Sequence, residues 1–206
     1  MDERKPSRTK RREISPSPIA TADEFFAMSG SEFQGIISDI RASKDDGTRP
    51  IPSATLVDRS TLLTPSKRAA LLDYVADLVD ENLAGRSEMC LQFAQLIHLA
   101  LSHLGMDSNA VAGTAMYFSD KGEEVFRWNH AWVRVGDEVI DGNTDSMVEN
   151  ITVPDTVKAP PYWGPIKEIP RRRVRGYDPP PGDTDVDNEW WPRLRAWLDG
   201  EFRNIP

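Results

Sequence analysis

The chain has 206 residues and a formal net charge of −8. This length suits one domain with tails, and the domain is large enough to bury a hydrophobic core. The acidic balance argues against nucleic acid as a partner of the folded domain. The single cysteine, Cys90, excludes an internal disulfide and argues against a cysteine-type zinc site, because such sites need several thiolates.

Histidine spacing and hydropathy set further limits. His98 and His103 are five residues apart on a predicted helix and therefore do not share a face, so we expect neither a metal nor a cofactor. No apolar run approaches the roughly 20 residues of a membrane-spanning helix, and the basic N-terminus lacks the apolar core of a secretory signal. We expect a cytoplasmic protein without a transmembrane segment, and export by a signal-independent secretion system stays open.

Residues 1–20 are rich in Lys and Arg and then in Ser and Pro, a composition that predicts a disordered basic tail. A basic arm for nucleic acid, a membrane or a targeting receptor is the functional alternative. The segment Thr21–Ser43 has apolar residues at helical spacing with a break near Ser29, which predicts two short helices or one kinked helix on the core.

The next predicted helix has Thr64 as its cap and Pro65 at its first position, and Gly85 ends it. Its apolar stripe predicts packing beside the helix that follows. That stripe consists of Leu71, Leu72, Val75, Leu78 and Val79.

A second strong helix is predicted from Ser87, which can cap it, to Gly105, which suits a left-handed C-terminal cap. Acidic Glu88 suits the first turn. Cys90 then lies in that first turn, where unpaired amides and the helix macrodipole favour a negative charge. The position therefore suits a thiolate nucleophile.

Three strands are predicted after this helix. Asn109–Phe118 and Val125–Val135 are rich in strand-forming residues and are joined by a turn at Ser119–Gly122. Gly136-Asp137 makes a two-residue hairpin, and Glu138–Asp141 is the third strand.

The hairpin predicts a contact between a histidine and an acid. Pairing Val135 with Glu138 makes Asp141 a same-face diagonal neighbour of His130, at about 7 to 8 Å between Cα atoms, which side chains can close. Asn143 is the alternative partner in the same register. The contact would hold the imidazole in one orientation and leave its other nitrogen for a nucleophile.

The chain after Asp141 is less regular. Val148–Val153 predicts a further strand, and Ala159–Pro165 predicts a stiff loop with two exposed aromatics that border a substrate groove or cover the sheet edge. Arg171–Arg175 predicts a solvated positive patch rather than a specific site.

A linker at Pro179–Gly182 precedes a Trp-rich helix over Asn188–Phe202, which either docks its Trp side on the core or binds a partner. We thus expect a tail at 1–20, one domain at 21–178, and the linker and docking helix at 179–206.

Four short runs follow one another along the chain: Glu-Met-Cys-Leu-Gln-Phe-Ala from Glu88, Val-Ala-Gly from Val111, His-Ala-Trp-Val-Arg-Val from His130, and Ile-Asp ending at Asp141. Their order and residues resemble the transglutaminase-like branch of the papain-like cysteine enzymes. The resemblance implies an α+β fold with N-terminal helices and the catalytic cysteine at a helix start packed against an antiparallel sheet. It implies Cys90 as nucleophile, His130 as general base and Asp141 as orienter.

The activity that the resemblance implies is acyl transfer on an amide bond through a thioester on Cys90. Water as acceptor gives a peptidase, amidase or deamidase, and an amine gives a transglutaminase; we favour hydrolysis of a protein or peptide substrate. Acetyl transfer from a thioester cofactor uses a similar triad. A non-catalytic protein-binding module on the same fold is the alternative function, and it predicts a buried, unreactive Cys90.

Overall fold

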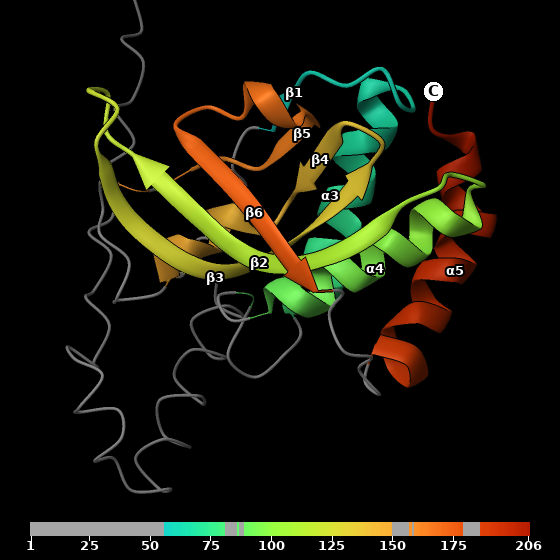
Figure 1. The fold of residues 1–206 in the computed structure, drawn as a ribbon. Coiled ribbons are helices and arrows are strands. Elements are labelled where there is room, and N and C mark those ends of the chain that lie inside the picture. The colour runs from blue at the N-terminus through green and yellow to red at the C-terminus, as the bar shows by residue number, and fades with distance from the viewer. Residues whose placement is uncertain (1–55, 81–85, 87–88, 150–156, 158, 179–185) are drawn as a thin grey trace, which may run out of the picture.

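The computed structural model of the chain describes residues 56–80, 86, 89–149, 157, 159–178 and 186–206 (Figure 1). The predicted tail, the helical segment Thr21–Ser43, the caps Ser87 and Gly85, and the linker Pro179–Gly182 lie outside these residues.

Six strands of the described residues form one mixed sheet in the order β1-β5-β4-β3-β2-β6. All neighbours pair antiparallel except β1 and β5, which are parallel. The α+β class is therefore confirmed, but the sheet is mixed rather than purely antiparallel. The strands are β1 Val57–Asp58, β2 Asn109–Phe118, β3 Glu124–Val135, β4 Glu138–Asp141, β5 Tyr162–Pro165 and β6 Arg172–Asp178.

Within the described part of the chain, three α-helices lie on one side of this sheet (Figure 1): α3 Pro65–Asp80, α4 Cys90–His103 and α5 Trp191–Asp199. Shorter helical turns cover Thr144–Glu149, Ile166–Glu168, Val186–Trp190 and Glu201–Asn204. None of the helices in the described part of the chain is long and apolar enough to cross a membrane.

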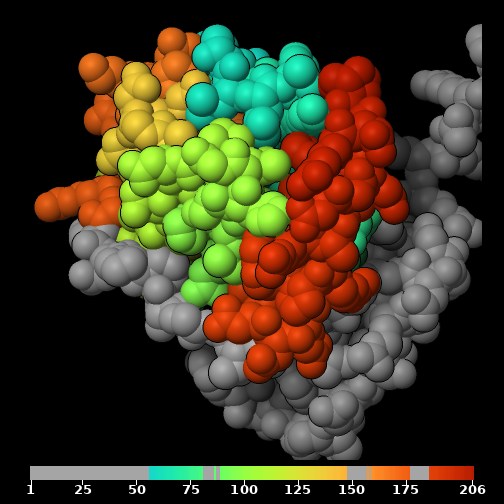
Figure 2. Space-filling model, turned by 90° about the vertical axis from the view of Figure 1, so that its right-hand side faces the viewer, coloured from blue at the N-terminus to red at the C-terminus, as the bar shows by residue number. Residues whose placement is uncertain are grey.

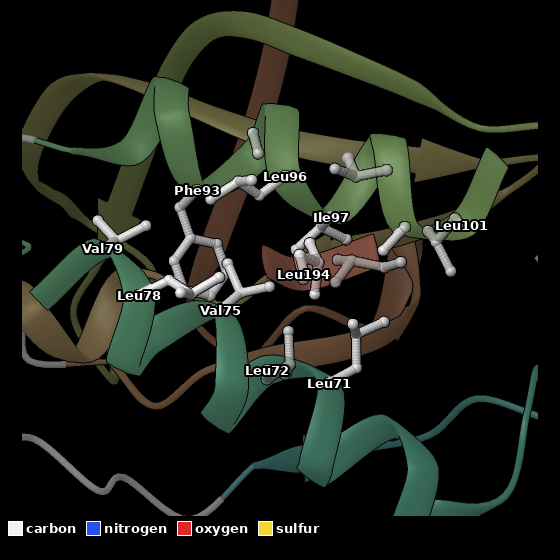
Figure 3. Close-up of a cluster of buried hydrophobic side chains, with 14 of the residues drawn as sticks. Leu71, Leu72, Val75, Leu78, Val79, Phe93, Leu96, Ile97, Leu101 and Leu194 are labelled. Atoms are coloured by element: carbon white, nitrogen blue, oxygen red, sulfur yellow. The ribbon is translucent and has the colours of Figure 1, made fainter. Parts of the chain in front are cut away.

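The main core lies between the helices and the sheet. Phe93, Ile97 and Leu101 of α4 point toward α3, whose predicted stripe is buried, and Leu194 of α5 enters the same cluster (Figure 3). The sheet contributes the buried side chains Ala131, Val133, Ile140 and Trp163. Because a buried Leu or Ile side chain contributes about 1.5 to 3 kcal/mol, this core fixes α4 firmly on the sheet.

The C-terminal segment also packs on the core. Leu194, Leu198 and Phe202 are buried, and the indole of Trp197 stacks on Tyr74 of α3 with ring centroids 4.2 Å apart. Figure 2 shows this segment, in red, on the surface beside α3 in cyan.

The sequence predicts the two ends of α4 unequally well. The N-cap is Met89 and Cys90 is the first residue, so the predicted cap at Ser87 is wrong, and no side chain caps this end among the described residues. At the other end Gly105 has a φ of +81°, and the amides of Gly105 and Met106 donate to the carbonyls of Ser102 and Leu101. This is a Schellman cap, which glycine adopts without steric cost.

Two predictions after Asp141 are wrong. The expected loop Ala159–Pro165 contains β5, which pairs with β4 on one side and β1 on the other, so Tyr162 and Trp163 are fully buried instead of exposed. Val148 and Glu149 lie in a 3-10 helix and not in a strand; the rest of Val148–Val153 lies outside the described residues. Pairing with distant strands decided the first outcome, and local sequence does not encode it.

Candidate active site

The strand pairings gather polar residues on the side of the sheet away from the helices. Opposed residues of an antiparallel pair point to the same side. Gly113 of β2 faces His130 of β3, and Tyr117 of β2 faces Arg172 of β6. By strand alternation His130, Tyr117 and Arg172 therefore share one side.

The β3–β4 hairpin brings His130 and Asp141 together. Val135 pairs with Glu138 across the two-residue turn, as predicted. The Nε2 atom of His130 lies 2.7 Å from Oδ1 of Asp141, and both side chains are at most 2% exposed. The diagonal contact expected from this register is present.

Cys90 reaches the same imidazole from the start of α4. The residue is half-buried, and it lies close enough to the ring of His130 for its thiol to help raise the pKa of that histidine. Because Asp141 holds Nε2, Nδ1 is the ring nitrogen left for the thiol. The structure thus gathers all three predicted site residues around one imidazole.

The approach of α4 to Asp141 depends on Gly142. A Cβ atom at Gly142 would lie 2.5 Å from Cε1 of Phe93 and 2.8 Å from Cδ2 of Leu72, so a larger residue would require these core side chains to shift. Phe93 lies less than one turn after Cys90, and its contact therefore holds the start of the helix beside the end of β4.

A buried ion pair anchors the chain just before Cys90. Nη2 of Arg86 lies 2.6 Å from Oδ2 of Asp145, and Nη1 lies 3.0 Å from Oδ1. Asn143 donates from Nδ2 to the backbone oxygen of Arg86 at 2.9 Å. Asn143, the alternative orienter in the sequence, is therefore part of this anchor, and Asp141 holds the histidine.

Arg172 is a member of the site that the sequence reasoning missed. Its side chain is 2% exposed, and Nη2 lies 3.3 Å from Oδ2 of Asp141. The prediction of a solvated patch at Arg171–Arg175 is therefore wrong for this residue, although Arg171, Arg173 and Arg175 are exposed. Strand alternation explains the difference within β6, because Arg172 points to the opposite side from Arg173.

Tyr117 completes the surroundings of the guanidinium. Cζ of Arg172 lies 5.8 Å from the centroid of the Tyr117 ring, within cation–π range. The Tyr117 hydroxyl donates to Sδ of Met147 at 3.1 Å. Burial raises the pKa of Tyr117 above its ordinary value, so the hydroxyl stays protonated.

Charges in the site favour an ionised histidine and an ionised aspartate. Burial alone would favour neutral imidazole, but the Asp141 carboxylate, and after it the Cys90 thiol, outweigh burial and raise the pKa of His130 to about 10. Burial would likewise favour a neutral carboxyl, but the charges of Arg172 and then His130 lower the pKa of Asp141 below its ordinary value. At neutral pH the pair is an imidazolium and a carboxylate.

The other histidines belong to the body of α4. Nδ1 of His98 lies 2.9 Å from Oγ of Ser108, and Nε2 of His103 lies 3.0 Å from Oδ1 of Asp199. Among the described residues, no group of three or more His, Cys, Asp or Glu side chains could hold a metal ion.

Trp132 lies beside the site. It is buried, and its ring centroid is 6.4 Å from that of His130. Comparison of the chain with protein-family models, curated proteins and solved structures finds no match.

Proposed function

We propose that the protein is a transglutaminase-like cysteine hydrolase that cleaves an amide bond in a protein or peptide through a thioester on Cys90. The observation that carries the proposal is the gathering of Cys90, His130 and Asp141 at a helix start and two neighbouring strands, with His130 hydrogen-bonded to Asp141 and influenced by the thiol. Nucleophile, base and orienter in mutual contact are the requirement for this chemistry.

In the acylation step Cys90, as a thiolate paired with the imidazolium of His130, attacks the carbonyl carbon of the amide. A C–S bond forms, the C–N bond breaks, and the imidazolium of His130 gives its proton to the leaving nitrogen. Because His130 is already protonated in the resting site, it acts first as a proton donor and only afterwards as a base.

In the deacylation step neutral His130 takes a proton from water, whose oxygen forms a C–O bond with the acyl carbon as the C–S bond breaks. The products are a carboxylic acid, the Cys90 thiolate and the His130 imidazolium, which restores the resting site. Asp141 stabilises the imidazolium and fixes the ring, so that one nitrogen always faces the sulfur.

The start of α4 also supplies a donor for the developing oxyanion. As the first residue of the helix, Cys90 has no intrahelical acceptor for its own amide. That N–H can bind negative charge on the former carbonyl oxygen, as backbone amides do in other acyl-transfer sites.

The exposure of the site also supports an enzyme over a non-catalytic binding module. The module predicts a buried thiol, but Cys90 is half-buried while its partners His130 and Asp141 are buried. A substrate can therefore reach the sulfur, and bulk water is kept from the charged pair behind it.

The test is the pH dependence of Cys90 alkylation by iodoacetamide, with the site confirmed by mass spectrometry. We expect wild type to reach half its maximal alkylation rate well below pH 8.5, which is about the pKa of a free thiol. In His130→Ala we expect the midpoint to move back up toward that pH. The matched control is His98→Ala. His98 lies on the same helix as Cys90 but is hydrogen-bonded to Ser108, so this variant should leave the pH profile of alkylation unchanged. A wild-type profile like that of a free thiol contradicts the proposal.

A further inference from the structure

The Asp141 carboxylate has two buried partners rather than one. Oδ1 lies 2.7 Å from Nε2 of His130, and Oδ2 lies 3.3 Å from Nη2 of Arg172. The contacts therefore continue beyond the predicted triad, from Cys90 through His130 and Asp141 to an arginine on the edge strand β6.

We propose that Arg172 is a positioning residue of the active site, which keeps the Asp141 carboxylate ionised and turned toward His130 and so maintains the reactive state of Cys90. The proposal rests on the proposed function and names a fourth member of the same site. Arg172 touches neither the sulfur nor a reacting atom, and it acts through Asp141.

Burial explains why the carboxylate needs this partner. Asp141 is 1% exposed, and an isolated carboxylate in such a place would take up a proton rather than stay charged. A protonated Asp141 could no longer stabilise an imidazolium at His130. The guanidinium supplies a permanent positive charge that pH does not remove.

The position of Arg172 is fixed by the fold. Its backbone pairs with Tyr117 of β2, and the Tyr117 ring lies beside the guanidinium. Nε and Nη1 of Arg172 are buried and make no hydrogen bond within the described residues. Asp141 is the one carboxylate that the structure shows in contact with Arg172 among these residues, so the ion pair with Asp141 is the charge compensation that this buried guanidinium has there.

The experiment compares the pH profile of Cys90 alkylation in wild type, Arg172→Met and Arg172→Gln. Removing an opposite charge at this distance raises a carboxyl pKa by about 1 to 3 units. We therefore expect the acid side of the profile to move to higher pH by about one unit or more, with an approximately tenfold loss of rate below the midpoint. Circular dichroism identifies the variants that fold, and Gln serves where the apolar Met does not.

Two further variants separate charge from packing. Arg172→Lys keeps the charge and should bring the midpoint back toward the wild-type value, whereas a purely structural role predicts that Lys and Met behave alike. Arg173→Met is the matched control, because Arg173 carries the same charge on the same strand but is exposed and lies against Phe118. It should not move the profile.

The outcomes are distinguishable from those of the proposed function. A wild-type midpoint well below that of a free thiol, unchanged in a folded neutral Arg172 variant, overturns the role of Arg172 and leaves the proposed function standing. A wild-type midpoint like that of a free thiol overturns the proposed function itself.

Discussion

The two sides of the sheet are buried by different kinds of side chain. The helix side is filled by aliphatic and aromatic residues of α3, α4, α5 and the strands, whereas the opposite side also buries His130, Asp141 and Arg172. Removing one buried methyl group from an apolar core lowers the stability of the protein by a small step. A network of buried charges instead fails when one member is lost, since its partner is left uncompensated.

The contrast between buried charges and apolar contacts can be broken most sharply at the buried ion pair of Arg86 and Asp145, which lies outside the strands. Arg86→Met leaves the Asp145 carboxylate buried without its bidentate partner, and we expect the free energy of unfolding to fall by about 3 to 5 kcal/mol in urea titrations. Arg59→Met is the control, because the Arg59–Glu168 pair is about half exposed and should cost less than about 1 kcal/mol. Equal losses in the two variants would contradict the contrast.

A smaller effect is expected from titrating His130. Its folded pKa of about 10 lies above its ordinary value of 6.5, so its stabilisation is complete below pH 6.5 and is lost as pH rises through 10. The slope is at most about 1.4 kcal/mol per pH unit. Unfolding of wild type and His130→Gln should therefore be compared between pH 6.5 and 9: the stability difference should shrink as pH rises, and a constant difference would be evidence against the charged pair.

The smallest effect belongs to the helix side. Ile97 is 1% exposed, and Ile97→Val should cost about 0.5 to 1.5 kcal/mol. The pH profile of Cys90 alkylation should stay at the wild-type midpoint, because no charge is touched. A shifted midpoint in this variant would show that packing on the helix side sets the reactivity of the thiol.

The helices that cover one side of the sheet were predictable, because short stretches of sequence determine where each of them lies and which of its sides packs on the core. The 3.6-residue spacing of α3, the glycine after α4 and the two-residue turn after Val135 each indicate one element. The same turn fixed the register that joins His130 to Asp141, so the central contact of the candidate site was also predicted correctly.

The remaining members of the site were not predictable in this way. Arg172 and Tyr117 meet because β6 pairs with β2 at the edge of the sheet, and Tyr162 is buried because β5 joins β4 and β1. Nothing in the residues near these positions specifies the partner strand. One signal was present in the run at Arg171–Arg175. If this run forms a strand, the side chains of Arg172 and Val174 point to the opposite side from those of Arg173 and Arg175.

The two-residue turn between β3 and β4 also has a consequence for folding. His130 and Asp141 lie on one hairpin, so their pair can form as soon as that hairpin closes, which takes on the order of microseconds. Cys90 and Arg172 are distant in sequence and join only when long-range contacts assemble. Cys90 therefore joins the pair late in folding. Until α4 docks on the sheet, a partly folded chain has a cysteine that no histidine activates.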